Sequence, residues 1–296
     1  MNDELKMMNY HELSSDRLFP SPSGRSGGAL DVKSLYGNSM SLVVLGSGSS
    51  GNMYILQNKH EALIIEAGVP FDNEARRALG WDTTKVVGVL VSHHHADHAG
   101  HARQMTDMGF KVYALPEVLK HCKLSVPFAV PIEVGRWWWI GGYKVLPFPL
   151  VHYNTDGTRC PICGFLIEHK DCGRVCFFTD CADFSREVMT ENGIEIKPYD
   201  FANINHWMIE ANYDNYILYR SKLEPYLKDR IKMSHMSIQR AVKTAKRIDL
   251  RQSREIVLIH LSAGNGDERK FVREMRKATG KRVVAAHRGM VVDFSI

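Results

Sequence analysis

The sequence VVGVLVSHHHADH at residues 86–98 decides the fold class. Its first six residues form an apolar, β-branched run, which is typical of a strand buried on both faces. Four side chains that suit borderline divalent metal ions follow at once, namely His93, His95, Asp97 and His98. In a sharp turn from strand to helix, alternate residues can face one site. The first two of these residues can therefore share one ion while the last two turn to another, and His94 is expected to point away.

Three more candidate ligands each follow an apolar strand later in the chain. They are His152 after residues 145–151, Asp180 after residues 174–179 and His260 after residues 256–259. Any one of them alone would more often be a hydrogen-bonded structural residue. Their shared position favours a role as ligands, and seven ligands exceed what one tetrahedral ion uses. The sequence therefore predicts two divalent ions, zinc or manganese, with iron also possible.

The rest of the chain predicts one α/β domain over residues 39–296. A flexible polar leader is expected at residues 1–38, because residues 21–28 are almost all serine, glycine and proline. Further strands are expected at residues 41–46, 53–57, 62–66, 111–114, 143–148, 163–168, 201–210, 283–286 and 290–294. Helices are expected at residues 72–79, 99–108, 216–232, 238–248 and 268–278. Two stacked sheets in one domain would accommodate this pattern.

Composition and charge distribution indicate the cellular location of the protein and the class of molecule that it binds. No apolar run of about 18 residues and no apolar N-terminal signal segment occur, so neither a membrane span nor secretion is favoured. The six cysteines all lie between residues 122 and 181, as expected for reduced thiols of a cytoplasmic protein. Residues 216–256 contain eleven Lys or Arg and four Asp or Glu, whereas the whole chain has a net charge of +5. Such a basic face recruits an anionic polymer, unless it is only a solvated helical surface.

The ordered series of ligands resembles the metallo-β-lactamase superfamily over nearly all of residues 41–296. More narrowly, LGSGSSGN at residues 45–52, EANYD at 210–214 and LIHLS at 258–262 look like the YycJ/WalJ group, whose members are DNA exonucleases or other hydrolases. The resemblance implies a four-layer αββα sandwich. It implies that His93, His95 and His152 hold one ion, that Asp97, His98 and His260 hold the second, and that Asp180 bridges them. A hydroxide between the ions would attack the substrate. Asp97 is expected to be a catalytic residue as well as a metal ligand.

One residue departs from the superfamily pattern. Glu66 stands where the superfamily usually has aspartate, in a position that orients the ligand shell without binding metal. Glutamate can accept the same hydrogen bonds from one carbon further out. A tolerated variation is therefore expected.

Two further groups are candidates for chemistry other than metal binding. His235 and Glu210 resemble the His–Glu relay of the tRNA 3′-processing endonuclease, and a protonated histidine there would protonate a leaving oxygen. The alternative is a structural role beside Ser237, the expected helix cap. Ser49, Ser50 and Asn52 lie in a glycine-serine loop that could bind phosphate, order the metal shell or form only a tight hairpin.

Two other motifs have structural interpretations that outweigh the functional ones. Cys160, Cys163, Cys172 and Cys176 could supply four thiolates to a zinc ion, but small buried thiols suit two strand segments better. The run of three tryptophans at residues 137–139 could stack on bases, but a hairpin packed on the core is favoured.

The predicted function is metal-dependent hydrolysis of phosphodiesters in nucleic acid, most specifically as a DNA exonuclease. An enzyme for a small ester, lactone, thioester, β-lactam or cyclic phosphodiester is the alternative. Neither the basic face nor His235 is needed for hydrolysing a lactone, thioester or β-lactam. A non-enzymatic binding module fits the full ligand set poorly. The sequence leaves the oligomeric state open.

Overall fold

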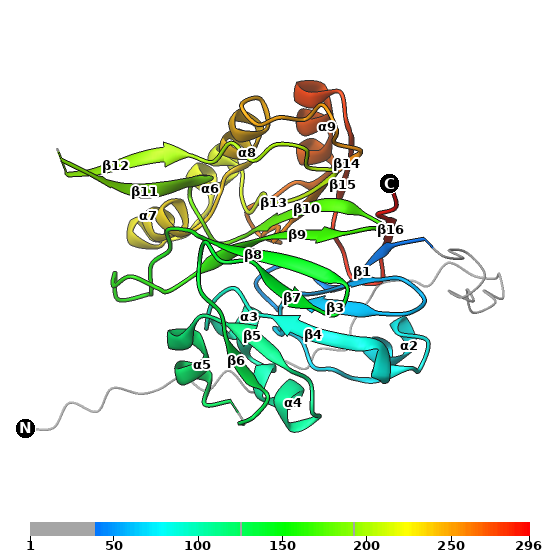
Figure 1. The fold of residues 1–296 in the computed structure, drawn as a ribbon. Helices are drawn as coiled ribbons and strands as arrows, with labels where there is room; N and C mark the ends of the chain where they lie inside the picture. Colours follow the sequence, from blue (N-terminus) through cyan, green and yellow to red (C-terminus); the bar gives the residue numbers. More distant parts are fainter. Residues whose placement is uncertain (1–38, 125, 192) are drawn as a thin grey trace, which may run out of the picture. The chain divides into compact units, whose positions relative to one another are not determined.

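The computed structural model describes residues 39–124, 126–191 and 193–296, and the expected leader at residues 1–38 lies outside them. Two seven-stranded sheets stack face to face, and helices cover both outer faces (Figure 1). All described residues belong to one compact unit. The predicted αββα sandwich is therefore confirmed.

The first sheet has the order β16-β1-β2-β3-β4-β5-β6. Its strands are β1 (Ser41–Gly46), β2 (Met53–Gln57), β3 (Ala62–Ile65), β4 (Val86–Leu90), β5 (Val112–Ala114), β6 (Ala129–Pro131) and β16 (Val291–Asp293). The N-terminal strands pair antiparallel, and from β3 to β6 the pairing is parallel. The C-terminal end of β4 thus reaches the same sheet edge as its parallel neighbours.

The second sheet has the order β15-β14-β13-β10-β9-β8-β7. Its strands are β7 (Trp138–Ile140), β8 (Tyr143–Pro149), β9 (Cys163–His169), β10 (Gly173–Phe178), β13 (His206–Glu210), β14 (Glu255–Ile259) and β15 (Arg282–Ala285). Strands β10, β13, β14 and β15 run parallel, so their carboxyl ends share one edge. The two C-terminal strands of the chain, β15 and β16, join different sheets.

Helical segments, only some of which bury apolar residues, lie outside the two sheets (Figure 1). They are α2 (Asn73–Ala78), the 3-10 turn η1 (Thr83–Lys85), α3 (Ala96–Ala99), α4 (Ala102–Asp107), α5 (Pro116–Cys122), α6 (Asn215–Arg220), α7 (Pro225–Ser234), α8 (Ile238–Ala245) and α9 (Glu268–Thr279). Alternation along the strands builds the layers: Leu42 joins the cluster between the sheets, whereas Val43 joins the one under α2, α4 and α5. Among the described residues, no helix combines the length and the apolar composition that a bilayer span requires.

Three expected elements differ in extent. The helix expected at residues 216–232 is two helices, because Pro225 cannot lie inside a helix and instead opens α7. The helix expected at residues 99–108 is likewise divided, with α3 ending at Ala99 and α4 beginning at Ala102. The strand expected at residues 201–210 is shorter and begins only at His206.

A hairpin of β11 (Ser185–Thr190) and β12 (Gly193–Pro198) was not predicted. It projects from the sandwich as a separate two-stranded sheet (Figure 1). Its second strand is exposed along its whole length. Because neither face is buried, the pattern of alternating burial that identifies most strands is missing here.

Candidate metal centre

All seven predicted ligands meet where strands of the two sheets end. The segment after β4 contributes His93 to His98 from the first sheet, and the segments after β8, β10 and β14 contribute the others. Asp180 and His260 have left-handed backbone conformations, with φ of 50° and 57°. Non-glycine residues adopt this conformation at a cost, and such positions cluster at functional sites.

The first set of ligand atoms comes from His93, His95, His152 and Asp180. His95 Nδ1 lies 3.1 Å from His152 Nε2. Asp180 Oδ2 lies 3.5 Å from His93 Nε2 and 3.8 Å from His152 Nε2. Ligands about 2.0–2.1 Å from a tetrahedral ion are roughly 3.3 Å apart. The set therefore has close to the spacing that one ion requires.

The second set comes from Asp97, His98, Asp180 and His260. His98 Nε2 lies 3.3 Å from His260 Nε2 and 3.5 Å from Asp180 Oδ1. Asp97 Oδ2 lies 3.1 Å from His260 Nε2 and 3.5 Å from His98 Nε2. One carboxylate oxygen of Asp180 thus faces each set.

The chemistry of these atoms fits divalent metal ions. Imidazole nitrogens face each other in both sets, and His93 Nε2 is buried without a hydrogen-bond partner. A shared metal ion would satisfy these facing nitrogens, and a buried polar atom without a partner is otherwise costly. Imidazole and carboxylate ligands suit zinc, manganese and iron alike.

Neighbouring side chains hold the ligands in orientation. Ser92 Oγ lies 2.9 Å from His93 Nδ1, Asn154 Oδ1 lies 3.2 Å from His95 Nε2, and Asn212 Nδ2 lies 3.1 Å from His260 Nδ1. Sequence reasoning assigned no such role to these three residues, since their contacts depend on the packing of distant segments. Partners of this kind fix the ring orientation of metal-binding histidines.

Glu66 lies in the position expected for an orienting carboxylate. It is fully buried, with a positive φ of 69°, at the end of β3. Its Oε1 lies 3.4 Å from His98 Nδ1, and its Oε2 accepts a hydrogen bond from the Ser92 backbone N–H at 3.3 Å. The longer side chain thus contacts His98 and the backbone that carries His93.

Carboxylates dominate the electrostatics of the second set. Burial lowers the pKa of His98 and His260, but the nearby carboxylates, with Asp180 first among them, together outweigh it. The pKa of His260 rises to about 10, and that of His98 lies well above its usual range. In the first set burial prevails, lowering the pKa of His152 to about 4 and that of His93 well below its usual range.

Metal uptake at pH 7.5 is expected to release protons, on the order of one or two per chain. His98 and His260 carry a proton there in the metal-free protein, because their raised pKa values lie above this pH. Binding through Nε2 displaces that proton, so metal affinity falls as the pH falls. Calorimetry of Zn²⁺ binding in buffers of different ionisation enthalpy measures the release. An enthalpy independent of the buffer would contradict this assignment of ligands.

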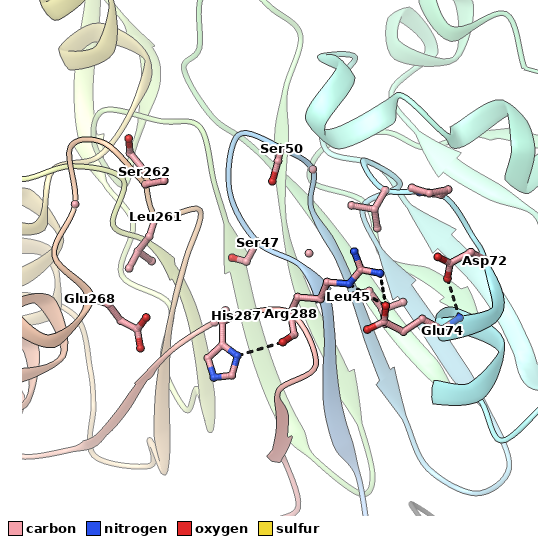
Figure 2. Close-up of a pocket in the computed structure, with 17 residues that line it drawn as sticks. Leu45, Ser47, Ser50, Asp72, Glu74, Leu261, Ser262, Glu268, His287 and Arg288 are labelled. Atoms are coloured by element: carbon pink, nitrogen blue, oxygen red, sulfur yellow. Dashed lines mark hydrogen bonds and ion pairs between the residues drawn. The ribbon is translucent and has the colours of Figure 1, made fainter. Parts of the chain in front are cut away.

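The three residues of the glycine-serine loop lie in different surroundings. Ser49 is exposed and lines the metal cavity of about 450 Å³. Ser50 instead lines a neighbouring cavity of about 610 Å³, where Arg288 is paired with Glu74 (Figure 2). Asn52 is 1% exposed, and its Nδ2 donates to the Asp97 carbonyl at 3.0 Å. The sequence allows three roles for this loop, and the contacts of Asn52 fit the one in which it orients the candidate metal ligands.

His235 and Glu210 lie together at the edge of the metal cavity. His235 Nδ1 is 2.8 Å from Glu210 Oε1, and His235 lines the cavity. Burial acts to raise the pKa of Glu210, but the adjacent His235 together with His260 outweighs it, so the pKa of this carboxyl is lowered. Glu210 Oε1 also lies 3.4 Å from His260 Nδ1, so this carboxylate contacts a ligand as well. Ser237 caps α8 as expected, accepting from the Arg240 N–H.

One positively charged residue that lines the metal cavity was not singled out from the sequence. Arg230, on α7, is the one Lys or Arg among the described residues that line it. The charge run at residues 216–256 was the available signal, but only the helix register selects the residue that reaches the site. Tyr153 and Thr155, in the segment after β8, also line the cavity.

Outside the two ligand sets, His94 and Cys160 lie within metal-ligand spacing of His95. His94 stacks on His121 with ring centroids 3.9 Å apart, and its Nδ1 lies 3.7 Å from Cys160 Sγ. Among the described residues, no group of four cysteines has metal-ligand spacing, and all six thiols are free. Within the tryptophan run only Trp139 is largely exposed, at 71%.

Comparisons with known proteins agree with this geometry. A family model described as a beta-lactamase superfamily domain matches residues 63–261. No curated protein sequence matches the chain significantly. The metallo-beta-lactamase fold protein YhfI from Bacillus subtilis is a similar solved structure, with 14% identity, a TM-score of 0.60, and coverage of 86% of this chain and 99% of that one.

Two other similar structures have names that concern phosphodiesters. The short form of human tRNase Z shares 15% identity, with a TM-score of 0.51, and the match covers 87% of this chain and all of that one. Unliganded yeast PDE1 shares 13% identity, with a TM-score of 0.58 and coverage of 86% and 99%. At such identities the likeness shows the fold alone. The family model covers about two thirds of the sequence, so the chain belongs to the metallo-β-lactamase superfamily of metal-dependent hydrolases.

Proposed function

We propose that the chain is a two-metal phosphodiesterase of nucleic acid, with DNA exonuclease activity as its most specific form. The observation that carries the proposal is the His235–Glu210 pair, 2.8 Å apart beside the ligand sets. An unactivated phosphodiester has a poor leaving group that needs a proton donor. The narrower resemblance to the YycJ/WalJ group supports DNA as the substrate and attack from an end.

The ligand sets define which residues would hold the ions. His93, His95 and His152 would hold one, Asp97, His98 and His260 the second, and Asp180 would give one oxygen to each. Divalent ions bound there would supply Lewis acidity and a nucleophile at neutral pH. Glu66 and Asn52 keep His98 and Asp97 in place through the contacts described above.

His235 would act as the general acid. Because its Nδ1 faces Glu210, the proton on Nε2 is the one available to the cavity. Its transfer would leave a neutral imidazole and a neutral alcohol where the P–O bond breaks. Glu210, which is buried, holds the His235 ring in this orientation through the 2.8 Å contact.

The substrate class is tested with protein reconstituted with Zn²⁺ or Mn²⁺. We expect hydrolysis of bis-p-nitrophenyl phosphate and of oligonucleotides, with a far lower kcat/KM for a lactone, a thioester and a β-lactam. Chelation should abolish all activity. Efficient hydrolysis of a carboxylic substrate without any phosphodiester hydrolysis would favour the alternative, a small-ester hydrolase.

Arg230→Ala is expected to raise KM for phosphodiesters by roughly 10–100-fold, the worth of a hydrogen bond to a charged group. Within the part of the chain that the structure describes, Arg230 is the one lysine or arginine that lines the cavity, so its guanidinium is the available cation for a non-bridging phosphate oxygen. Steady-state kinetics measures the change, with Arg269→Ala on the exposed face of α9 as the matched control. An unchanged KM for every phosphodiester would remove Arg230 from substrate binding.

A further inference from the structure

A second charged hollow, of about 400 Å³, lies between α7, α8 and the base of the β11–β12 hairpin. Lys232 of α7 and Arg240 and Lys243 of α8 line it. Arg240 and Lys243 are three residues apart, so they lie on the same face of the helix. Three cations from two helices therefore converge on one hollow.

The acidic neighbours of these cations leave a positive excess. Lys232 Nζ pairs with Asp229 at 3.0 Å, and Arg240 Nη1 lies 3.9 Å from Asp183. Neither aspartate lines the hollow. Surface pairs of this kind contribute little, so an entering anion can replace them. The N-cap of α8 also borders the hollow, and the positive end of the helix dipole favours an anion there.

The hollow and the metal cavity share a wall. Ser234 and His235 line the cavity, whereas Lys232 and Ser237 line the hollow. On the other side Ala182 lines the hollow only two residues after Asp180, a Cα separation of at most about 7 Å. Successive phosphates of a stacked strand advance about 3.4 Å along its axis. A strand with one phosphate at the metal cavity therefore brings another phosphate to the hollow within a few nucleotides.

We propose that this hollow binds a backbone phosphate of the strand being hydrolysed, a few nucleotides from the reacting phosphodiester. The inference rests on the proposed nucleic-acid function and adds a second anchoring point to it. The hollow binds the strand through its charge, and this contact does not distinguish one base from another. Substrates that are too short to reach the hollow lose this contact. Their affinity for the protein is therefore expected to be lower than that of longer strands.

The test measures binding of a fluorescent 12-nucleotide single strand to the full chain by anisotropy, over a range of salt concentrations. The double variant Arg240→Gln/Lys243→Gln is compared with Lys246→Gln, a lysine just beyond α8 that does not line the hollow. Glutamine keeps helix propensity, so the fold should persist. We expect affinity to fall roughly tenfold, with the slope of log K against log salt reduced by about 0.7 per lost phosphate contact. The control should match wild type.

The failures are distinguishable. If the wild type hydrolyses bis-p-nitrophenyl phosphate while the double variant keeps its affinity and salt slope, the hollow is no phosphate site and the proposed function stands. Weaker binding with an unchanged salt slope would also overturn the inference, because the lost contact would not be to a phosphate. If the wild type neither binds the strand nor hydrolyses any phosphodiester, both proposals fail.

Discussion

Asp180→Ala is expected to empty both ligand sets and to lower hydrolysis of every substrate by on the order of 10⁴-fold or more. Asp180 is 2% exposed, and its two oxygens face different sets. Removing them also leaves His98 and His260 without the carboxylate that most favours their protonated forms. Elemental analysis should give about two ions per chain for the wild type and less than one for the variant.

The matched control is Asp229→Ala, an exposed aspartate on α7 outside both sets. It should retain wild-type metal content. If Asp180→Ala loses activity but keeps two ions, then Asp180 acts on substrate and the bridging assignment is wrong. A wild-type content that stays at or below one ion after reconstitution would exclude the two-metal proposal.

His235→Ala is expected to slow hydrolysis of a phosphodiester with a poor leaving group by roughly 10²–10⁴-fold, the usual worth of a general acid. The change removes a proton donor but no member of the two ligand sets, so metal content should remain near wild type. A nitrophenolate leaving group needs little protonation, and its hydrolysis should suffer much less. The ratio of the two rates is therefore the informative measurement.

Glu210→Gln does not isolate acid catalysis as cleanly. Glu210 contacts His260 at 3.4 Å as well as His235 at 2.8 Å, so this variant is expected to weaken the second ligand set too. His287→Ala provides the matched histidine control, because His287 lines the neighbouring cavity (Figure 2) and is not among the described residues that line the metal cavity. Equal slowing of both substrates by His235→Ala, with metals retained, would make His235 a positioning or structural residue.

The sequence could predict that the candidate ligands lie together, because each segment that contributes them follows a buried strand. Parallel strands such as β10, β13 and β14 end at a common edge, so Asp180, Glu210 and His260 had to lie near one another once the sheet was correct. The stacking of the second sheet on the first then brought the turn after β4 to the same edge. The superfamily resemblance supplied the chain order of the ligands.

Contacts that depend on tertiary packing were not predictable in the same way. Asn154 reaches His95 from a loop, and Arg230 enters the cavity only because Pro225 starts a new helix and resets its register. Pro225 is present in the printed sequence, and a proline inside a helical pattern predicts that the helix ends before it. The expected helix should therefore have been divided at this residue. The β11–β12 hairpin escaped because exposed strands lack the burial pattern on which strand prediction depends.

The proposed nuclease activity is tested by incubating metal-reconstituted protein with 5′- and 3′-labelled single- and double-stranded DNA and RNA. Asp180→Ala, prepared in parallel, controls for contaminating nuclease. We expect metal-dependent release of nucleotides from an end of DNA by the wild type and none by the variant. Wild-type protein that holds two ions yet leaves every labelled DNA and RNA intact would contradict the proposed activity.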